Sequence, residues 1–231
     1  MKKEIVKSLV ENLGQEYSEI LGIKLDAKDD REIFKWFLAA ILFGAPITEK
    51  SVIKTYSCFE KHDAITPRKI LEKGWRGLVE ILDQGSYTRY DFKTSDKLLK
   101  VMDNLVNTYH GELSNVHDSA SDPADLERRL KSLGKGIGYV TVSIFLRELR
   151  NIWEKADPKP TPLVILAARE LEITKAENPE EVLKDMKGFW ESNKVQGKTF
   201  VNFETALLRF GKNNRRKKID QSSLKNNLKP V

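Results

Sequence analysis

The chain of 231 residues contains 40% hydrophobic and 32% charged residues and has a net charge of +6. This composition supports a packed core, and the absence of an apolar run of about 18 residues excludes a transmembrane helix. The single cysteine, Cys58, excludes an internal disulfide and a four-cysteine metal or iron–sulfur site. Acidic residues in the first segment argue against a signal or transit peptide, so we expect a cytoplasmic, nucleoid-associated protein without membrane contact.

Helical periodicity runs along the whole sequence, and no window alternates as a half-buried strand would. Apolar residues spaced four apart predict a helix over residues 2–21. Residues 30–43 are the most apolar segment and predict a buried central helix that begins after Asp29–Asp30 and ends near Gly44. The sequence therefore predicts an all-α fold.

Further helices follow in chain order. Thr48 and Thr66–Pro67 are typical helix starts, and glycines divide the segment after Thr66 into two short helices. A loop then leads to a helix that ends before Gly111. The remaining helical segments are residues 124–133, 139–156, 163–173, 178–193 and 199–211.

Basic residues gather at the C-terminus. The stretch NNRRKKID covers residues 213–220, and two further lysines follow it. A segment with so little apolar content is either a frayed, solvated end of the chain or a set of contacts to phosphate.

Three glycines alternate with other residues in LKSLGKGIGYV, residues 130–140. Each of Gly134, Gly136 and Gly138 costs a helix about 1 kcal/mol relative to alanine, so this stretch predicts a tight turn between two helices. Backbone N–H groups at the start of the second helix favour an anion, and missing side chains would let a phosphodiester approach without sequence readout. The alternative is a glycine-rich connection that binds nothing.

The stretch LKSLGKGIGYVTVSIFL resembles the helix-hairpin-helix of DNA glycosylases related to endonuclease III, whose pattern is Leu-Pro-Gly-Val-Gly. Residues 31–52 and 162–171 are similar to the family's segments before and after that motif, so the resemblance covers about residues 28–172. It implies two helical lobes with a DNA-binding cleft between them and a base flipped out of the duplex. The implied lobes are residues 27–152, ending in the hairpin, and residues 1–26 with 153–212, followed by a basic tail over 213–231.

The resemblance also implies the partner and the contacts. A monomer would bind double-stranded DNA through the hairpin residues Gly134, Lys135, Gly136, Ile137, Gly138 and Tyr139. Ile137 would pack back between the two helices and fix the turn. In some members of the family the turn holds a monovalent cation through carbonyl oxygens, and the sequence permits this here. We expect no other cofactor and no iron–sulfur cluster.

The positions that carry the family's chemistry differ in this chain. Val140 stands where members that also nick the strand have a lysine, so abasic-site lyase activity is not expected. Thr161 stands where the family has its catalytic aspartate, and Pro46 replaces a glutamine that fills the gap left by the flipped base. The nearest acid, Asp157, is the candidate catalytic carboxylate; otherwise it is an Asp-Pro turn that ends a helix.

A loop and scattered side chains complete the candidates. Two aromatics and a cation, Tyr87, Arg89 and Tyr90, lie in the predicted loop GSYTRYDFK, where they could stack on bases or wedge between them. The three histidines show no metal-ligand spacing, so no metal site is expected. The four tryptophans, Trp36, Trp75, Trp153 and Trp190, fall on apolar faces and are expected in the core.

Three functions fit these observations. The first is a monofunctional DNA glycosylase of base-excision repair that hydrolyses the bond to a damaged or mismatched base. The second is a catalytically inactive DNA-binding protein of the same fold. The third is an all-α interaction module in which the hairpin only turns a corner.

Overall fold

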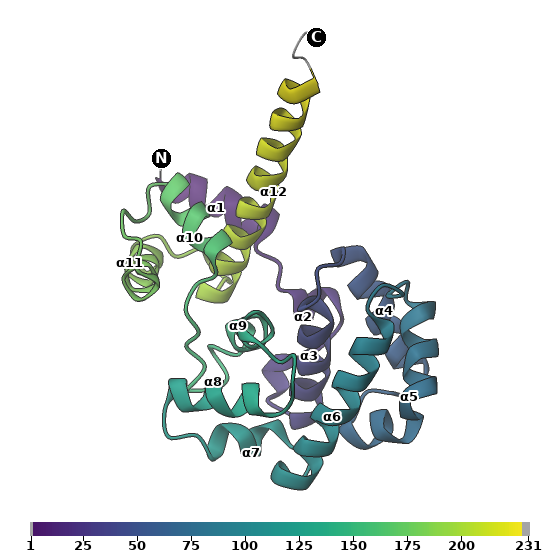
Figure 1. Ribbon diagram of the computed structural model, residues 1–231. Coiled ribbons are helices and arrows are strands. Elements are labelled where there is room, and N and C mark those ends of the chain that lie inside the picture. The colour runs from purple at the N-terminus through teal and green to yellow at the C-terminus, as the bar shows by residue number, and fades with distance from the viewer. Residues whose placement is uncertain (1, 228–231) are drawn as a thin grey trace. The chain divides into compact units, whose positions relative to one another are not determined.

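Every regular element is a helix in the computed structural model, which describes residues 2–227 and, of their side chains, those over residues 3–215 (Figure 1). The all-α class is therefore confirmed for this part of the chain. No helix within it is long and apolar enough to cross a membrane.

The helices form two compact units. One unit, called here the hairpin unit, is Tyr17–Pro158; the other, the terminal unit, combines Met1–Glu16 with Lys159–Val231. The lobes predicted from the sequence, with boundaries at residues 27 and 152, stay a prediction.

The hairpin unit contains both helices of the glycine motif. Its elements are α2 (Tyr17–Ile20), the 3-10 turn η1 (Leu25–Ala27), α3 (Asp30–Phe43), α4 (Glu49–Lys61), α5 (Pro67–Gln84), α6 (Asp91–Tyr109), α7 (Leu113–Asp118), α8 (Pro123–Ser132) and α9 (Tyr139–Glu148). The elements of the terminal unit are α1 (Lys2–Leu13), α10 (Pro162–Glu170), α11 (Pro179–Ser192) and α12 (Phe200–Asn227).

Helix α3 is the centre of the hairpin unit, as its apolar sequence predicts. It packs against η1, α4, α7 and α9, and its residues from Trp36 to Leu42 are fully buried. The Trp36 indole Nε1 donates a hydrogen bond to the Phe145 carbonyl of α9 at 3.0 Å. At the start of α3, the Asp30 carboxylate accepts hydrogen bonds from the Leu113 and Ser114 N–H groups and so caps α7.

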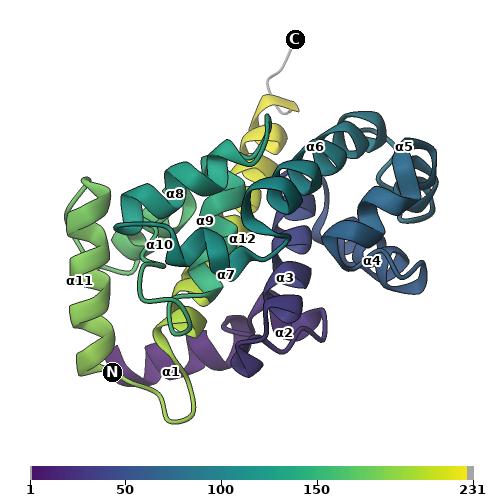
Figure 2. The same cartoon turned by 90° about the horizontal axis from the view of Figure 1, so that it is seen from below.

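The helix starts at Thr48 and Thr66 and the helix break that follows them are confirmed. The Thr48 and Thr66 side chains accept hydrogen bonds from the N–H groups of Ser51 and Lys69 at the starts of α4 and α5. The backbone at Gly74 has φ +62° and divides α5 into the two short helices that were predicted. The second half of α5 then packs beside α6 (Figures 1 and 2).

Two predicted helices are shorter in the structure, and one is longer. The single helix predicted over residues 2–21 is wrong, because α1 ends before Gly14, where a Cβ would lie 2.4 Å from the Val10 carbonyl oxygen. The helix predicted over residues 139–156 ends at Glu148. Helix α12 extends to Asn227 into the predicted tail, but the basic side chains beyond residue 215 and residues 228–231 lie outside the described part.

A buried carboxylate connects the two ends of the hairpin unit. The two carboxylate oxygens of Glu148 accept hydrogen bonds from the N–H groups of Tyr17 and Ser18, each at 2.9 Å. The guanidinium of Arg147 lies 3.6 Å from Glu148 and 5.7 Å from the centre of the Tyr17 ring. Glu148 therefore caps α2 from the far end of α9 and is itself paired.

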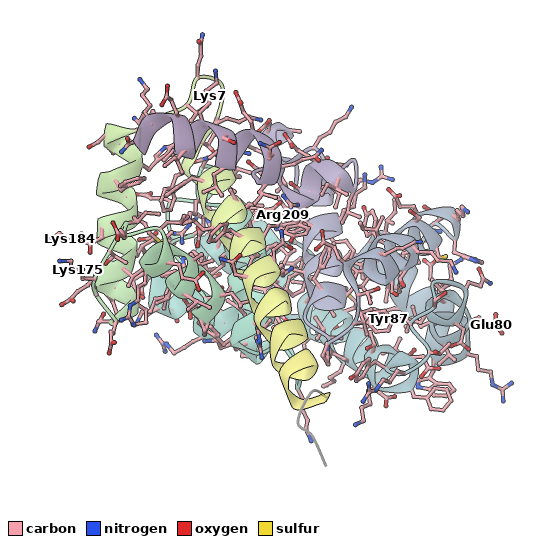
Figure 3. All side chains as sticks on the ribbon, turned by 90° about the horizontal axis from the view of Figure 1, so that it is seen from above. Lys7, Glu80, Tyr87, Lys175, Lys184 and Arg209 are labelled. Atoms are coloured by element: carbon pink, nitrogen blue, oxygen red, sulfur yellow. The ribbon has the colours of Figure 1, made fainter. Side chains whose placement is uncertain are left out.

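Helix α12 is the axis of the terminal unit, with α1, α10 and α11 packed around it (Figure 2). Figure 3 labels Arg209 on this helix, whose Nη1 donates hydrogen bonds to the carbonyls of Leu13 and Gln15. Gly211 permits a close approach to α10, since a Cβ there would lie 2.4 Å from the Leu163 carbonyl oxygen.

Replacing Glu148 with alanine is expected to lower the free energy of unfolding by about 3 kcal/mol, because two buried N–H groups and a buried guanidinium lose their acceptor. Urea denaturation measures the change. Glu80→Ala, which removes an exposed carboxylate from α5 (Figure 3), serves as the control and is expected to change stability by less than about 0.5 kcal/mol. Equal stability of the two variants would contradict the capping role.

Candidate nucleic-acid interface

The glycine motif forms a tight turn between α8 and α9. Helix α8 ends at Ser132, the Ile137 N–H donates a hydrogen bond to the Gly134 carbonyl at 3.1 Å, and α9 begins at Tyr139. The Ile137 side chain is buried, which confirms that it packs back into the unit. Only the backbone of Ile137 is therefore presented to a ligand.

The three glycines of the turn differ in their backbone conformation and in what surrounds them. A Cβ at Gly134 would lie 2.7 Å from Cγ2 of Val101, so this glycine allows the turn to pack on α6. Gly136 has φ +95°, a conformation that side chains disfavour. Gly138 has an ordinary extended backbone with open space where a Cβ would lie, so nothing in the unit itself requires a glycine there.

One face of α6 holds the turn in place. The Asn104 Nδ2 donates a hydrogen bond to the Leu133 carbonyl at 2.8 Å, Val101 packs on Gly134, and the side chain of Lys97 passes beside Gly136. Residues 97, 101 and 104 lie on one helical face because they are four and three apart. The sequence analysis missed this helix as a part of the site, since the pairing of two distant segments leaves no local pattern.

The start of α9 is open and electropositive. Gly138 occupies the N-cap position and provides no side-chain cap, so the N-terminal dipole of α9 is not offset by a carboxylate at that position. Lys135 is exposed within the turn, and Lys131 of α8 lies 5.9 Å from the centre of the exposed Tyr139 ring. A bare backbone turn, a helix N-terminus and lysines are the features of a site for a phosphate group.

Val140 lies in the first turn of α9 with 55% of its surface exposed. Its hydrocarbon side chain offers no amine at the position where the resemblance implies a lysine.

Asp157 lies near the end of the hairpin unit in an ion pair with Arg150. The Arg150 side chain is 5% exposed and its Nη2 also donates a hydrogen bond to the Pro158 carbonyl, so the guanidinium is fixed. The Asp157 side chain remains 41% exposed. Arg150 thus fixes the loop that follows α9 and holds the Asp157 carboxylate at the surface of that loop.

Thr161 occupies the N-cap of α10, directly before Pro162 at the first helical position. Its side chain does not cap the helix, and its Oγ1 has no hydrogen-bond partner among the described residues. The position that the resemblance assigns to an aspartate is therefore a helix start in this chain too, but without a carboxylate.

The predicted base-stacking loop is only partly exposed. The Tyr87 side chain is 1% exposed, and its hydroxyl donates a hydrogen bond to the Leu42 carbonyl at 2.8 Å (Figure 3). Burial raises the pKa of the Tyr87 hydroxyl well above its usual value. This corrects the prediction for Tyr87, which is a core residue; Arg89 is exposed and lies 5.5 Å from the centre of the half-buried Tyr90 ring.

The structure is similar to the crystal structure of the 3-methyladenine DNA glycosylase MagIII of H. pylori bound to 1,N6-ethenoadenine. The TM-score is 0.55 with 16% sequence identity, over 92% of this chain and 98% of that chain. The chain has the helix-hairpin-helix DNA glycosylase fold. No protein-family model and no curated protein sequence matches it.

This example of the glycosylase fold exposes an aromatic pair that the sequence analysis missed. Trp75 of α5 is 40% exposed and Phe92 of α6 is 56% exposed, with ring centres 5.2 Å apart. The prediction that Trp75 is a core residue is therefore wrong, because its indole packs beside the exposed Phe92 ring and stays partly uncovered. The other three tryptophans are buried as predicted.

No cluster of three or more metal-ligating side chains occurs among the described residues. Two of the histidines contact other side chains: His62 contacts Gln84, and His117 stacks on Trp153 with ring centres 4.9 Å apart. His110 ends α6 in a left-handed conformation.

Substituting alanine for Gly136 is expected to lower the free energy of unfolding by about 1–2 kcal/mol, because the backbone has a left-handed φ and a Cβ would meet Lys97. The same substitution at Gly138 is expected to change stability by less than about 0.5 kcal/mol. Chemical denaturation of the two variants checks this difference. A destabilising Gly138→Ala with a neutral Gly136→Ala would contradict the turn geometry described above.

Proposed function

We propose that this protein is a monofunctional DNA glycosylase that binds double-stranded DNA and hydrolyses the bond between a damaged or mismatched base and its sugar. The observation that carries the proposal is the glycine turn at the open N-terminus of α9, in a chain with the DNA glycosylase fold. The neighbour MagIII is described as a 3-methyladenine DNA glycosylase, and its crystal structure holds a modified adenine.

The hairpin residues would bind the sugar–phosphate backbone. Backbone N–H groups around Gly136, Gly138 and Tyr139 would donate hydrogen bonds to phosphate oxygens, and Lys135 would add an exposed positive charge. Such contacts position the duplex without reading its sequence. The same turn could hold a monovalent cation through its carbonyl oxygens, and no other cofactor is needed for hydrolysis.

Asp157 would stabilise the positive charge that develops on the sugar during base release. Departure of the base leaves positive charge on the sugar, which a nearby carboxylate stabilises while it orients a water molecule for attack. Arg89 and Tyr90 would wedge into the gap left by the flipped base or stack on the bases beside it. Val140 provides no amine for a Schiff base, so the protein would release the base and leave the strand intact.

The place in the cell where the protein would act follows from its proposed substrate, DNA. The protein would act on chromosomal DNA as a monomer, associated with the nucleoid and not with a membrane. Its net charge of +6 favours this polyanionic partner.

Replacing Gly138 with glutamate is expected to weaken duplex binding on the order of a hundredfold, since the side chain blocks backbone approach and its charge repels phosphate. Fluorescence anisotropy with a labelled duplex measures the affinity. Gly188→Glu in α11 introduces the same residue at another open glycine and is the matched control. Equal binding by both variants would remove the hairpin from the interface.

Replacing Asp157 with asparagine is expected to reduce base release on the order of a hundredfold, because the amide cannot stabilise the sugar cation. Duplexes containing alkylated purines, 1,N6-ethenoadenine, uracil, 8-oxoguanine or thymine glycol are incubated with excess protein, and abasic sites are revealed with hot alkali. Asp103→Asn removes an exposed, lysine-paired carboxylate from α6 and serves as the control. Strand breaks before alkali treatment would contradict the monofunctional assignment.

A second candidate, DNA binding without base excision, is favoured by a specific observation. Thr161 occupies the helix start at which the resemblance implies an aspartate, and Asp157 is already paired with Arg150. Tight duplex binding without base release from any of these lesions would select this function.

A further inference from the structure

A lysine on α6 lies beside the hairpin turn although it is far from the turn in sequence. The Cε of Lys97 is 2.8 Å, and its Nζ 3.5 Å, from the place where a Cβ on Gly136 would be. The ammonium group is therefore close to the part of the turn that lacks side chains.

The charge of Lys97 has no partner in the part of the chain whose side chains the structure describes. Its side chain is half-buried, and it makes no ion pair or hydrogen bond among the described residues. Burial alone lowers the pKa of Lys97, with no carboxylate opposing the effect. Two other lysines differ in this respect, since Lys100 of the same helix pairs with Asp103 and Lys131 of α8 pairs with Glu127.

The neighbouring residues of α6 hold the hairpin turn beside Lys97. Val101 and Asn104, one and two turns further along the same face of α6, hold the hairpin at Gly134 and Leu133. The Lys97 stem passes Gly136 at the outer end of this contact. A larger residue at 136 would displace the Lys97 stem from this position.

We propose that Lys97 is a phosphate-binding residue that acts together with the hairpin turn when the protein binds duplex DNA. The inference rests on the proposed DNA binding but not on base excision. An unpaired, partly desolvated cation gains more from an incoming phosphate than an exposed, paired lysine does. Lys97 would thus extend the interface from the α8–α9 hairpin onto α6.

Lys97→Met tests the charge while keeping the stem, because methionine has heavy atoms as far as the Cε position that contacts Gly136. The affinity for a short labelled duplex without a lesion is measured by anisotropy over a series of KCl concentrations. Lys97→Met is expected to weaken binding roughly tenfold at the lowest salt and to reduce the slope of log affinity against log salt by about 0.9. Lys97→Arg, which keeps the charge, should retain most of the affinity.

Lys100→Met is the matched control, since it removes the same charge from an exposed, paired position on the same helix. Its affinity is expected to stay within about twofold of the unmodified protein. Equal losses in Lys97→Met and Lys100→Met, or none in either, would overturn the proposal. Binding by the unmodified protein without base release would refute the glycosylase function and leave the Lys97 proposal intact, whereas absent duplex binding at every salt concentration would overturn both.

Chemical modification of the unmodified protein answers the same question without depending on a variant. Bound duplex is expected to protect the Lys97 amine from acetic anhydride, as read by mass spectrometry of peptides, while Lys100 stays reactive. Equal acetylation of Lys97 with and without saturating DNA would overturn the proposal.

Discussion

The packing of the glycine turn against α6 is the constraint on which the candidate interface depends. A turn of six residues between two helices has no rigid shape of its own, and here it is held from one side. Gly134 approaches Val101 closely, the Leu133 carbonyl accepts a hydrogen bond from Asn104, and Ile137 is inserted into the core. Gly136, beside which the Lys97 stem passes, and Gly138, with open space where a Cβ would lie, are exposed. A phosphate would therefore meet a preformed backbone surface. The entropy cost of ordering the turn is part of folding and would not lower the binding affinity.

Two carboxylates, the half-buried Asp30 and the buried Glu148, order the rest of the hairpin unit in the same way. Asp30 at the start of α3 caps α7, and Glu148 at the end of α9 caps α2. Each carboxylate accepts two N–H groups from a segment more than 80 residues away. Short helices such as α2 and α7 are unstable alone, so these acceptors determine where they begin. The position of α9, and with it the hairpin, is therefore coupled to the first helix of the unit through Glu148.

The parts of this structure that could be predicted from the sequence are those with a local cause. The buried run of α3, the threonine caps of α4 and α5 and the break at Gly74 each follow from residues next to one another in the chain. The burial of Tyr87 and the exposure of Trp75 could not be predicted, because both depend on which neighbour covers the side chain. For the same reason the hairpin was found from its glycines, whereas Lys97 was not, since its relation to Gly136 exists only after α6 and the turn have packed.

In the proposed reaction, catalysis would depend on how much of the Asp157 charge reaches the substrate. The guanidinium of Arg150 is fixed by a second bond to the Pro158 carbonyl, so it cannot move aside without opening the loop. A paired carboxylate and guanidinium act at a distance as a dipole, whose field falls faster than that of a lone charge. Stabilisation of a sugar cation would then require direct contact with the Asp157 side chain, which is 41% exposed. An unpaired aspartate at the position of Thr161 would act over a longer range. For the proposed function, the difference between base excision and DNA binding alone would thus depend on whether the sugar can reach the Asp157 carboxylate.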